Sequence, residues 1–272
     1  MSAAPGSFAE RARSWRPPPL IARAWLRWLL VGGSLVYLAL ALGSLEINWA
    51  RLVTGLDRAA QFIRGFLQPD FTARWGDVVV GMKESLTMTV TSTVAGIALS
   101  IPVALGAARN LAPRWVYYGC RGFIAVARSL HEVVIAILLV ALVGFGPFAG
   151  FLTITFATIG FLAKLLAEDI EDTDAAQLEA IRATGASWWQ LVNYGVQPQV
   201  LPRLVGLCLY RLDINFRDSA IVGIVGAGGI GATLNTAIDR YEFDVAAGVL
   251  IIIIAIVFAV EVSSGWIRNQ VQ

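Results

Sequence analysis

The stretch "LTMTVTSTVAGIALSIPVALGAA", residues 86–108, contains 23 residues and no charged side chain. A helix rises about 1.5 Å per residue, so a run of this length crosses a hydrocarbon core of about 30 Å. Its alternating threonines (Thr87, Thr89, Thr91 and Thr93) are typical of a strand. In lipid, however, a helix satisfies its own backbone, and threonine hydroxyls can bond to carbonyls one turn earlier. The stretch therefore predicts a transmembrane helix.

The composition of the whole chain agrees with this prediction. Its 272 residues are 57% hydrophobic and 15% charged, with a mean hydropathy of +0.68, whereas a soluble domain has about 25% charged residues. The net charge of +2 gives no reason to expect a nucleic-acid partner. Two isolated cysteines, Cys120 and Cys208, and the single histidine His131 form no disulfide framework and no metal-ligand set. We expect an all-α integral membrane protein that holds no metal.

Further apolar runs predict about six transmembrane helices. Residues 1–27 form a basic tail with five arginines and one acid, which places the N-terminus in the cytoplasm. No small-residue cleavage site follows, so 28–45 is expected to be a retained first span rather than a signal peptide. Residues 46–84 are expected to be an external amphipathic segment, and 85–268 a helical core. Beyond 86–108, spans are expected from Trp115 to 144–150, from Phe148 to Leu166, from Val200 onward, and from Val245 to Val260. Residues 219–238 could add one crossing.

A glycine-rich stretch, "IVGIVGAGGIG" at 221–231, resembles a dinucleotide-binding fingerprint. Gly226, Gly228 and Gly231 have the G-x-G-x-x-G spacing, and Asp244 follows as a candidate ribose ligand. A dinucleotide fold also needs further strands that alternate with soluble helices, and the sequence offers no second such unit. In an apolar segment, glycines break a helix or let two helices approach closely. We therefore predict a gate or helix break at Gly226, Gly228, Gly229 and Gly231.

The polar segment 171–202 predicts two short helices joined by a glycine turn on the cytoplasmic side. Thr173 is the expected N-cap of the first helix, and Gly185 is its expected C-terminal stop. Ser187 opens the second helix with Gln190 three residues later, as in a capping box. Pro198 and Pro202 are expected to end that helix. From spacing alone, a plain cytoplasmic hairpin remains an alternative to a functional one.

Within this segment, "EAIRATG" (179–185) resembles the EAA loop of ABC-importer permeases. Glu179, Ala180 and Gly185 match the family pattern. Ile181 replaces its second alanine, while Gly195 and Gln197 replace an apolar residue and a leucine near its end. The resemblance implies that residues 173–197 are coupling helices that dock into an ATPase subunit. The coupling residues that it implies are Glu179, Ala180, Gly185, Ala186 and Pro198.

Two more motifs, "GFGPFAG" (144–150) and "IVGAGGIG" (224–231), resemble the phosphonate permease group (PhnE-like), which includes phosphite and hypophosphite importers. This resemblance implies a type I importer permease fold and a cargo of phosphonate or a related reduced phosphorus oxyanion. Methionine permeases share a similar "VGAGG" stretch, so methionine or another small nutrient is the alternative cargo.

The same resemblance implies the partners of the chain. They are a second copy of itself, two ABC ATPase subunits that bind ATP and Mg, and a periplasmic substrate-binding protein, all at the bacterial inner membrane. The chain has no G-x-x-x-x-G-K-[ST] motif of its own. We therefore expect a non-enzymatic subunit that holds no cofactor.

Two clusters of polar and charged residues interrupt the apolar spans. The first comprises Arg128, Ser129, His131 and Glu132; the second comprises Arg211, Asp213, Asn215, Arg217, Asp218 and Ser219. Such groups are costly in a bilayer and usually face a cavity or one another. We expect i,i+4 pairs between Arg128 and Glu132 and between Asp213 and Arg217.

Two interpretations of these clusters stay open. In the first, these residues line a translocation pathway; Arg211 is the one member of the two clusters that is not assigned to it. Arginines in such a pathway suit a phosphorus oxyanion. In the second, the charges only pair with one another and fix the rotation of the helices. A membrane-embedded enzyme that uses His131 and Glu132 is a third hypothesis. The lack of a second metal ligand argues against it.

Overall fold

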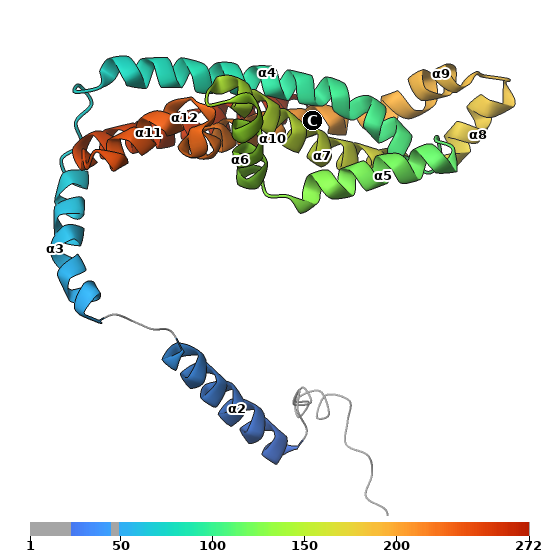
Figure 1. Ribbon diagram of the computed structural model, residues 1–272. Coiled ribbons are helices and arrows are strands. Elements are labelled where there is room, and N and C mark those ends of the chain that lie inside the picture. Colours follow the sequence, from blue (N-terminus) through green and yellow to red (C-terminus); the bar gives the residue numbers. More distant parts are fainter. Residues whose placement is uncertain (1–22, 45–48, 272) are drawn as a thin grey trace, which may run out of the picture. The chain divides into compact units, whose positions relative to one another are not determined.

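The computed structural model describes residues 23–44 and 49–271 and divides the chain into two units after Arg58 (Figure 1). Helix α2 (Ala24–Gly43) belongs to the first unit, and helix α3 (Trp49–Phe66) runs from the first unit into the second. α2 is long and apolar enough to cross a membrane, and it buries none of its own residues. It corresponds to the predicted first span, whereas most of the predicted basic tail lies outside the described residues.

The second unit is a bundle of helices, and its described residues include no strand, as the sequence predicts. Its longer helices are α4 (Trp75–Ala107), α5 (Arg114–Ser129), α6 (Glu132–Val143), α7 (Pro147–Glu171), α10 (Gln197–Val222), α11 (Ile230–Asp239) and α12 (Phe243–Val271). Between α7 and α10 lie α8 (Ala175–Ala183), α9 (Trp188–Leu191) and the π-helical turn η1 (Val192–Val196); a second π turn, η2 (Gly223–Ala227), follows α10.

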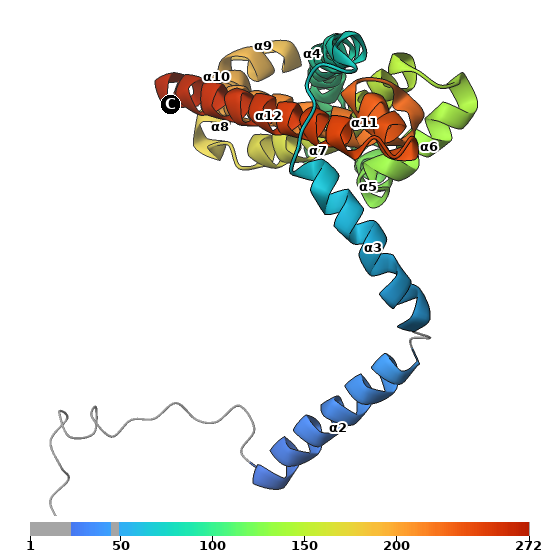
Figure 2. The ribbon, with the colours of Figure 1, turned by 90° about the vertical axis from the view of Figure 1, so that its left-hand side faces the viewer.

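Helix α7 forms the centre of this bundle. It packs against α4, α5, α6 and α10, and most of its apolar span is buried. The close approach of α4 depends on Gly96, because a methyl group there would overlap the side chain of Thr158. Figures 1 and 2 show α12 alongside α10 and α11, which it contacts.

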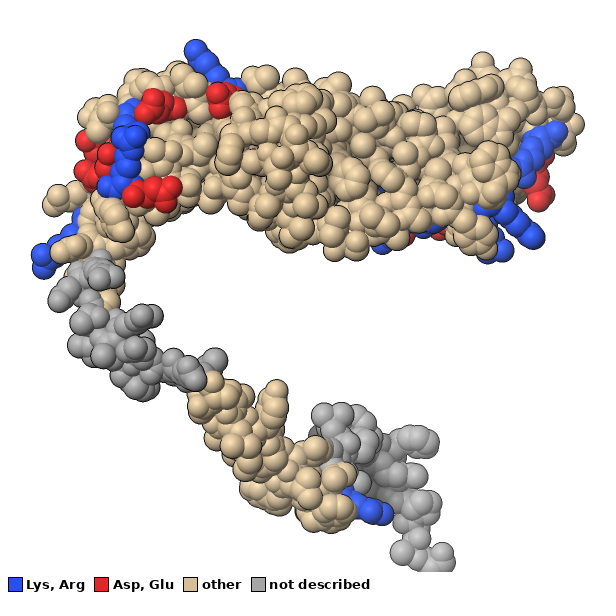
Figure 3. Space-filling model, in the orientation of Figure 1, with Lys and Arg blue, Asp and Glu red and all other residues tan. Residues whose placement is uncertain are grey.

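The described helices account for up to six membrane crossings, the number expected from the sequence. Four are single helices, α2, α4, α7 and α12, and two are bent pairs, α5 with α6 and α10 with α11. On the face drawn in Figure 3, the charged side chains of the second unit gather at its two ends and leave a broad uncharged middle. This distribution is typical of a multi-pass membrane protein.

The third predicted span is not one helix, which corrects the sequence-based interpretation. α5 ends at Ser129, α6 begins at Glu132, and the two axes differ by 94°. Leu130 has an extended backbone, and the N-cap residue His131 accepts a hydrogen bond at Nδ1 from Val133 N–H (3.3 Å). No glycine or proline marks the break, and the polar residues at 128–132 interrupt the apolar run without indicating a bend, so hydropathy predicts one span.

The helix that covers 86–107 begins earlier than predicted, at Trp75. Residues 75–84, assigned from the sequence to the external segment, therefore form its first turns. The predicted behaviour of the threonines is confirmed: Thr87, Thr89, Thr91 and Thr93 each donate a hydrogen bond of 2.6–2.8 Å to the carbonyl four residues earlier.

Candidate functional site

The hairpin of residues 173–197 has the local structure that its sequence predicts. α8 and α9 are joined through Gly185, whose φ of +80° lies in the left-handed region that glycine tolerates. The capping box at Ser187 and Gln190 is present, with Gln190 Oε1 2.8 Å from Ser187 N. One detail differs: Asp174, not Thr173, caps α8, because its carboxylate accepts from Ala176 N–H at 2.9 Å.

The two prolines that were expected to end the second helix do not end it. The chain stays helical from Trp188 through η1 into α10. Pro198 lies at the start of α10, directly after the π-helical turn η1, and Pro202 lies inside this helix. The hairpin therefore continues directly into a membrane helix, with no loop between them.

The hairpin is fixed to the bundle on one side and open on the other. Leu178 and Leu191 are buried in a core that includes residues of α4, α7 and α10. Arg182 donates to the carbonyl of Asn110 (3.3 Å), and Trp188 Nε1 donates to the carbonyl of Leu111 (3.2 Å). The coupling residues that the resemblance implies lie on the open side: Glu179, Ala180, Gly185 and Pro198 are exposed, and Ala186 is partly exposed.

Two of the departures from the family pattern contact each other. A methyl group added to Gly195 would lie 2.8 Å from Cδ2 of Leu178 and 3.1 Å from Cδ1 of Ile181. Leu178 and the larger residue at 181 thus together fill the space that a side chain at 195 would occupy. Compared with the family pattern, position 181 has a larger side chain and position 195 has none, so the hairpin stays packed although its motif is irregular.

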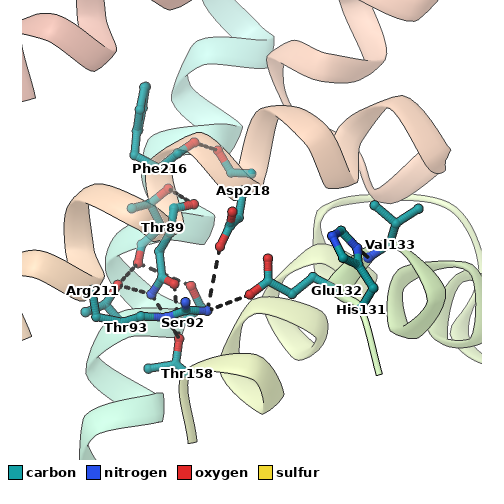
Figure 4. Close-up of polar contacts among 12 residues, drawn as sticks. Thr89, Ser92, Thr93, His131, Glu132, Val133, Thr158, Arg211, Phe216 and Asp218 are labelled. Atoms are coloured by element: carbon teal, nitrogen blue, oxygen red, sulfur yellow. Dashed lines mark hydrogen bonds and ion pairs between the residues drawn. The ribbon is translucent and has the colours of Figure 1, made fainter. Parts of the chain in front are cut away.

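A second set of residues forms a polar cluster where α6, α7 and α10 meet (Figure 4). The guanidinium of Arg211 is buried, with 3% of the residue exposed. Its Nη2 lies 3.1 Å from Glu132 and 3.6 Å from Asp218, and its Nε donates to Thr158 Oγ1 (3.2 Å). The ring of Phe161 lies 5.4 Å from the guanidinium carbon. The arginine is thus surrounded by partners from this chain.

This cluster corrects one predicted pair and confirms another. Arg128 and Glu132 do not share a helical face, because the break between α5 and α6 lies between them; Glu132 pairs with Arg211 instead. Asp213 and Arg217 do pair, at 3.5 Å.

Hydrogen bonds extend the cluster to α4. Asn215 is fully buried, and its Nδ2 donates to Thr93 Oγ1 (2.7 Å) and to Thr158 Oγ1 (3.0 Å). Ser219 is also buried and donates to the carbonyl of Phe216 at 2.7 Å. Inside a membrane such bonds satisfy groups that have no water to bond to. These contacts hold three spans in one arrangement.

The predicted glycine break is present and receives the loop between α6 and α7. Gly226, Gly228 and Gly229 have φ values of +96°, +78° and +76°. Gly146 N–H donates to the carbonyl of Gly226 (3.0 Å), and a methyl group on Gly226 would overlap the ring of Phe145. The two sequence motifs at 144–150 and 224–231 therefore pack against each other.

Helix α4 closes the break from another side. Glu84 Oε2 accepts from Gly229 N–H (2.9 Å), and Ser85 Oγ accepts from Ile230 N–H (3.0 Å), so two α4 side chains cap the N-terminus of α11. Gly231 lies within α11 and not in the break. A side chain there would overlap the carbonyl oxygen of Ala220, so this glycine allows a close helix crossing.

Residues 96–272 match the family described as "Binding-protein-dependent transport system inner membrane component". The chain belongs to this family. It is 40% identical over 251 residues to the phosphate-import permease protein PhnE of Mycolicibacterium smegmatis. The match covers 92% of this chain and 46% of the relative, so the chain spans about half of that relative's length. It is also 38% identical over 233 residues to the putative phosphite transport system permease protein HtxC of Stutzerimonas stutzeri, which covers 85% and 82% of the two chains.

The fold of this inner membrane component is also similar to that of a solved structure. The MetNI methionine ABC transporter, in an inward-facing conformation, aligns with a TM-score of 0.65 at 23% identity. The match covers 74% of this chain and 99% of that chain. The predicted resemblance to phosphonate and phosphite permeases, the importer-permease fold and the multi-pass membrane character are confirmed.

The residues predicted to line a pathway in this inner membrane component differ in their burial. Asn215 and Ser219 are buried and bonded within the chain, and Asp213, Asp218 and Glu132 are largely enclosed. Four lie on the surface of the single chain: Arg128, Ser129, His131 and Arg217.

The sequence interpretation did not include Arg211, Thr93 or Thr158 among the site residues of this inner membrane component. A helical pattern could have identified Arg211, since positions 211, 215 and 218 share one face of a helix. The two threonines contact Asn215 only through tertiary packing.

Proposed function

We propose that this chain is the transmembrane subunit of an ATP-driven importer for a phosphorus oxyanion. The sequence motifs favour phosphonate, phosphite or hypophosphite, and the name of the mycobacterial relative adds phosphate. The subunit acts as a pair of copies with two ATPase subunits and a periplasmic binding protein. It lies in the bacterial inner membrane with its N-terminus and hairpin in the cytoplasm.

The observation that carries the proposal is the exposed hairpin of residues 173–197. Its outer surface displays Glu179, while Leu178 and Leu191 fix it to a core shared with α4, α5, α7 and α10. A partner that displaces the hairpin therefore moves those helices as well, because packed interiors transmit strain. ATP and Mg are bound by the partner, and this chain contributes the mechanical connection.

The surface groups within the membrane region fit an anionic cargo. Arg217 is 53% exposed at its side chain and is held by Asp213, and Arg128, Ser129 and His131 are also exposed. A guanidinium can bind two phosphoryl oxygens at once. Arg211 has a different role in this proposal, since its partners lie within the chain. It fixes the positions of α6 and α10, so it also positions His131 at the start of α6 and Arg217 on α10.

The first experiment measures ATPase activity of the whole complex in lipid with its binding protein, screened with phosphonates, phosphite, hypophosphite, phosphate and methionine. Stimulation by one or more of the phosphorus oxyanions, with none by methionine, is the expected result. Stimulation by methionine alone would overturn the cargo class and leave the transporter assignment in place. ATPase activity that no candidate changes would contradict the proposed cargo altogether.

A second experiment tests the hairpin. Glu179→Ala removes an exposed carboxylate from α8, and we expect less ATPase subunit to co-purify with the variant. The matched control is Asp239→Ala, which removes an exposed carboxylate from the end of α11 and should leave co-purification unchanged. Equal amounts of ATPase subunit with both variants would show that Glu179 is not part of the docking surface.

A further inference from the structure

A basic, aromatic cavity lies beside the hairpin, at the start of α5. It has a volume of about 400 Å³ and is lined by Arg109, Ala112, Arg114, Tyr117 and Tyr118. No carboxylate is among these lining residues. By contrast, the cavity between α4 and α11 is lined by Asp77 and Glu84 as well as Arg74.

The two arginines of this cavity are available to a ligand. Arg109 and Arg114 are exposed, and neither guanidinium has a hydrogen bond or ion pair with any other residue that the structure describes. The nearby carboxylate of Glu171 is already occupied: it accepts from the backbone N–H of Arg109 (2.7 Å) and pairs with Arg121 (3.0 Å). The positive charge of the cavity is therefore not neutralised from within.

The aromatic wall of the cavity is held in place from behind. Arg121 donates to the carbonyl of Ala107 (2.9 Å), and its guanidinium carbon lies 5.5 Å from the centre of the Tyr117 ring. Tyr117 in turn packs edge-on against Tyr118, with ring centres 5.2 Å apart. A fixed wall with two free guanidiniums is suited to a phosphate group, which takes charge-assisted hydrogen bonds from arginine.

We propose that this cavity binds a phosphate-type oxyanion, and that its source is the headgroup of an anionic phospholipid. Trp115 and Tyr118 are 79% and 71% exposed beside the cavity, as is typical of aromatic residues at a membrane interface. The hydrogen bonds of Asn110 and Leu111 to the hairpin place the cavity at the same end of the bundle. Figure 3 shows basic side chains gathered at that end. The assignment to the inner leaflet rests on the proposed function, which places the hairpin in the cytoplasm.

The test counts lipids retained by the purified full-length protein in native mass spectrometry, during titration with phosphatidylglycerol. The variant is Arg109→Gln/Arg114→Gln. The matched control is Arg64→Gln/Arg240→Gln, which removes two exposed arginines near the opposite end. At a membrane surface, two arginines correspond to about a 30-fold change in affinity. We expect that loss for the cavity variant and wild-type retention for the control.

Equal retention by the two double variants would overturn the proposal. A competition arm with inorganic phosphate distinguishes the two sources of the oxyanion. If phosphate displaces the lipid, the ligand is a soluble oxyanion and the lipid assignment is overturned, while the two-arginine site stands. If phosphate does not displace it, the headgroup assignment is supported. The titration contains no ATP, and no candidate cargo is present when the two double variants are compared, so failure of the proposed transport function would not change that comparison.

Discussion

Nη2 of Arg211 on α10 lies 3.1 Å from Oε1 of Glu132, the first residue of α6, although 79 residues separate them in the chain. This ion pair connects the second half of one bent pair of helices to the first half of the other. Asp218 adds a second carboxylate at 3.6 Å. The arrangement of the two bent spans therefore depends on one buried guanidinium.

Replacement of this guanidinium should destabilise the protein strongly. Arg211→Gln leaves Glu132 and Asp218 without their cation, and breaking a buried ion pair costs about 3–5 kcal/mol. Thermal unfolding of the purified protein in detergent measures the loss. Arg217→Gln is the control, because that side chain is 53% exposed and its pair is worth at most about 1 kcal/mol. Similar losses for both variants would contradict the assigned role of Arg211.

The glycine break should reject even a single methyl group. Gly226→Ala forces a left-handed conformation that costs about 1–2 kcal/mol and drives a methyl group into the Phe145 ring. We expect a lower unfolding temperature. Gly119→Ala serves as the control, since it lies in α5 with open space around it and should gain up to about 1 kcal/mol from helix propensity. An unchanged unfolding temperature for Gly226→Ala would show that the break is not fixed.

The contact between Ile181 and Gly195 predicts compensation. Gly195→Ala alone should destabilise the hairpin, and Ile181→Ala alone should leave a void. The double variant should lose less stability than the sum of the losses in the two single variants. The expected coupling energy is about 0.5–3 kcal/mol, as for residues in contact. Hydrogen exchange of the 173–197 backbone amides measures the local stability of each variant. Strict additivity would mean that the two positions do not share one space.

The hydrogen bonds of Asp70, in the loop before α4, predict that the protein loses part of its stability at low pH. Its Oδ1 accepts hydrogen bonds from Thr72 N and Oγ1 (both 2.7 Å) and from Ala73 N (3.2 Å), and these bonds lower the pKa of the carboxyl. Since the folded pKa lies below the unfolded value of about 3.9, the contribution to stability is present above that pH and is lost as the pH falls through the folded pKa. The unfolding temperature of Asp70→Asn should therefore fall less on acidification than that of the wild type. A parallel fall in both proteins would exclude this contribution.

The sequence by itself determined the class of the protein and the structure of its hairpin. A long uncharged run in a bilayer forms a helix, because a helix satisfies the hydrogen bonds of its own backbone. The capping box at Ser187 and the turn at Gly185 depend on residues within one helical turn. Such local terms act wherever the segment lies in the fold, and so they can be recognised from neighbouring residues alone.

Only the tertiary structure decided which distant groups meet. Hydropathy did not reveal the 94° bend before Glu132 or the pairing of that residue with Arg211. It also did not reveal that the loop of Phe145 packs into the break at Gly226. These contacts depend on how each helix is rotated and at which angle it crosses its neighbours. Rotation and crossing angle come from the packing of many side chains at once, and no short stretch of sequence contains that information.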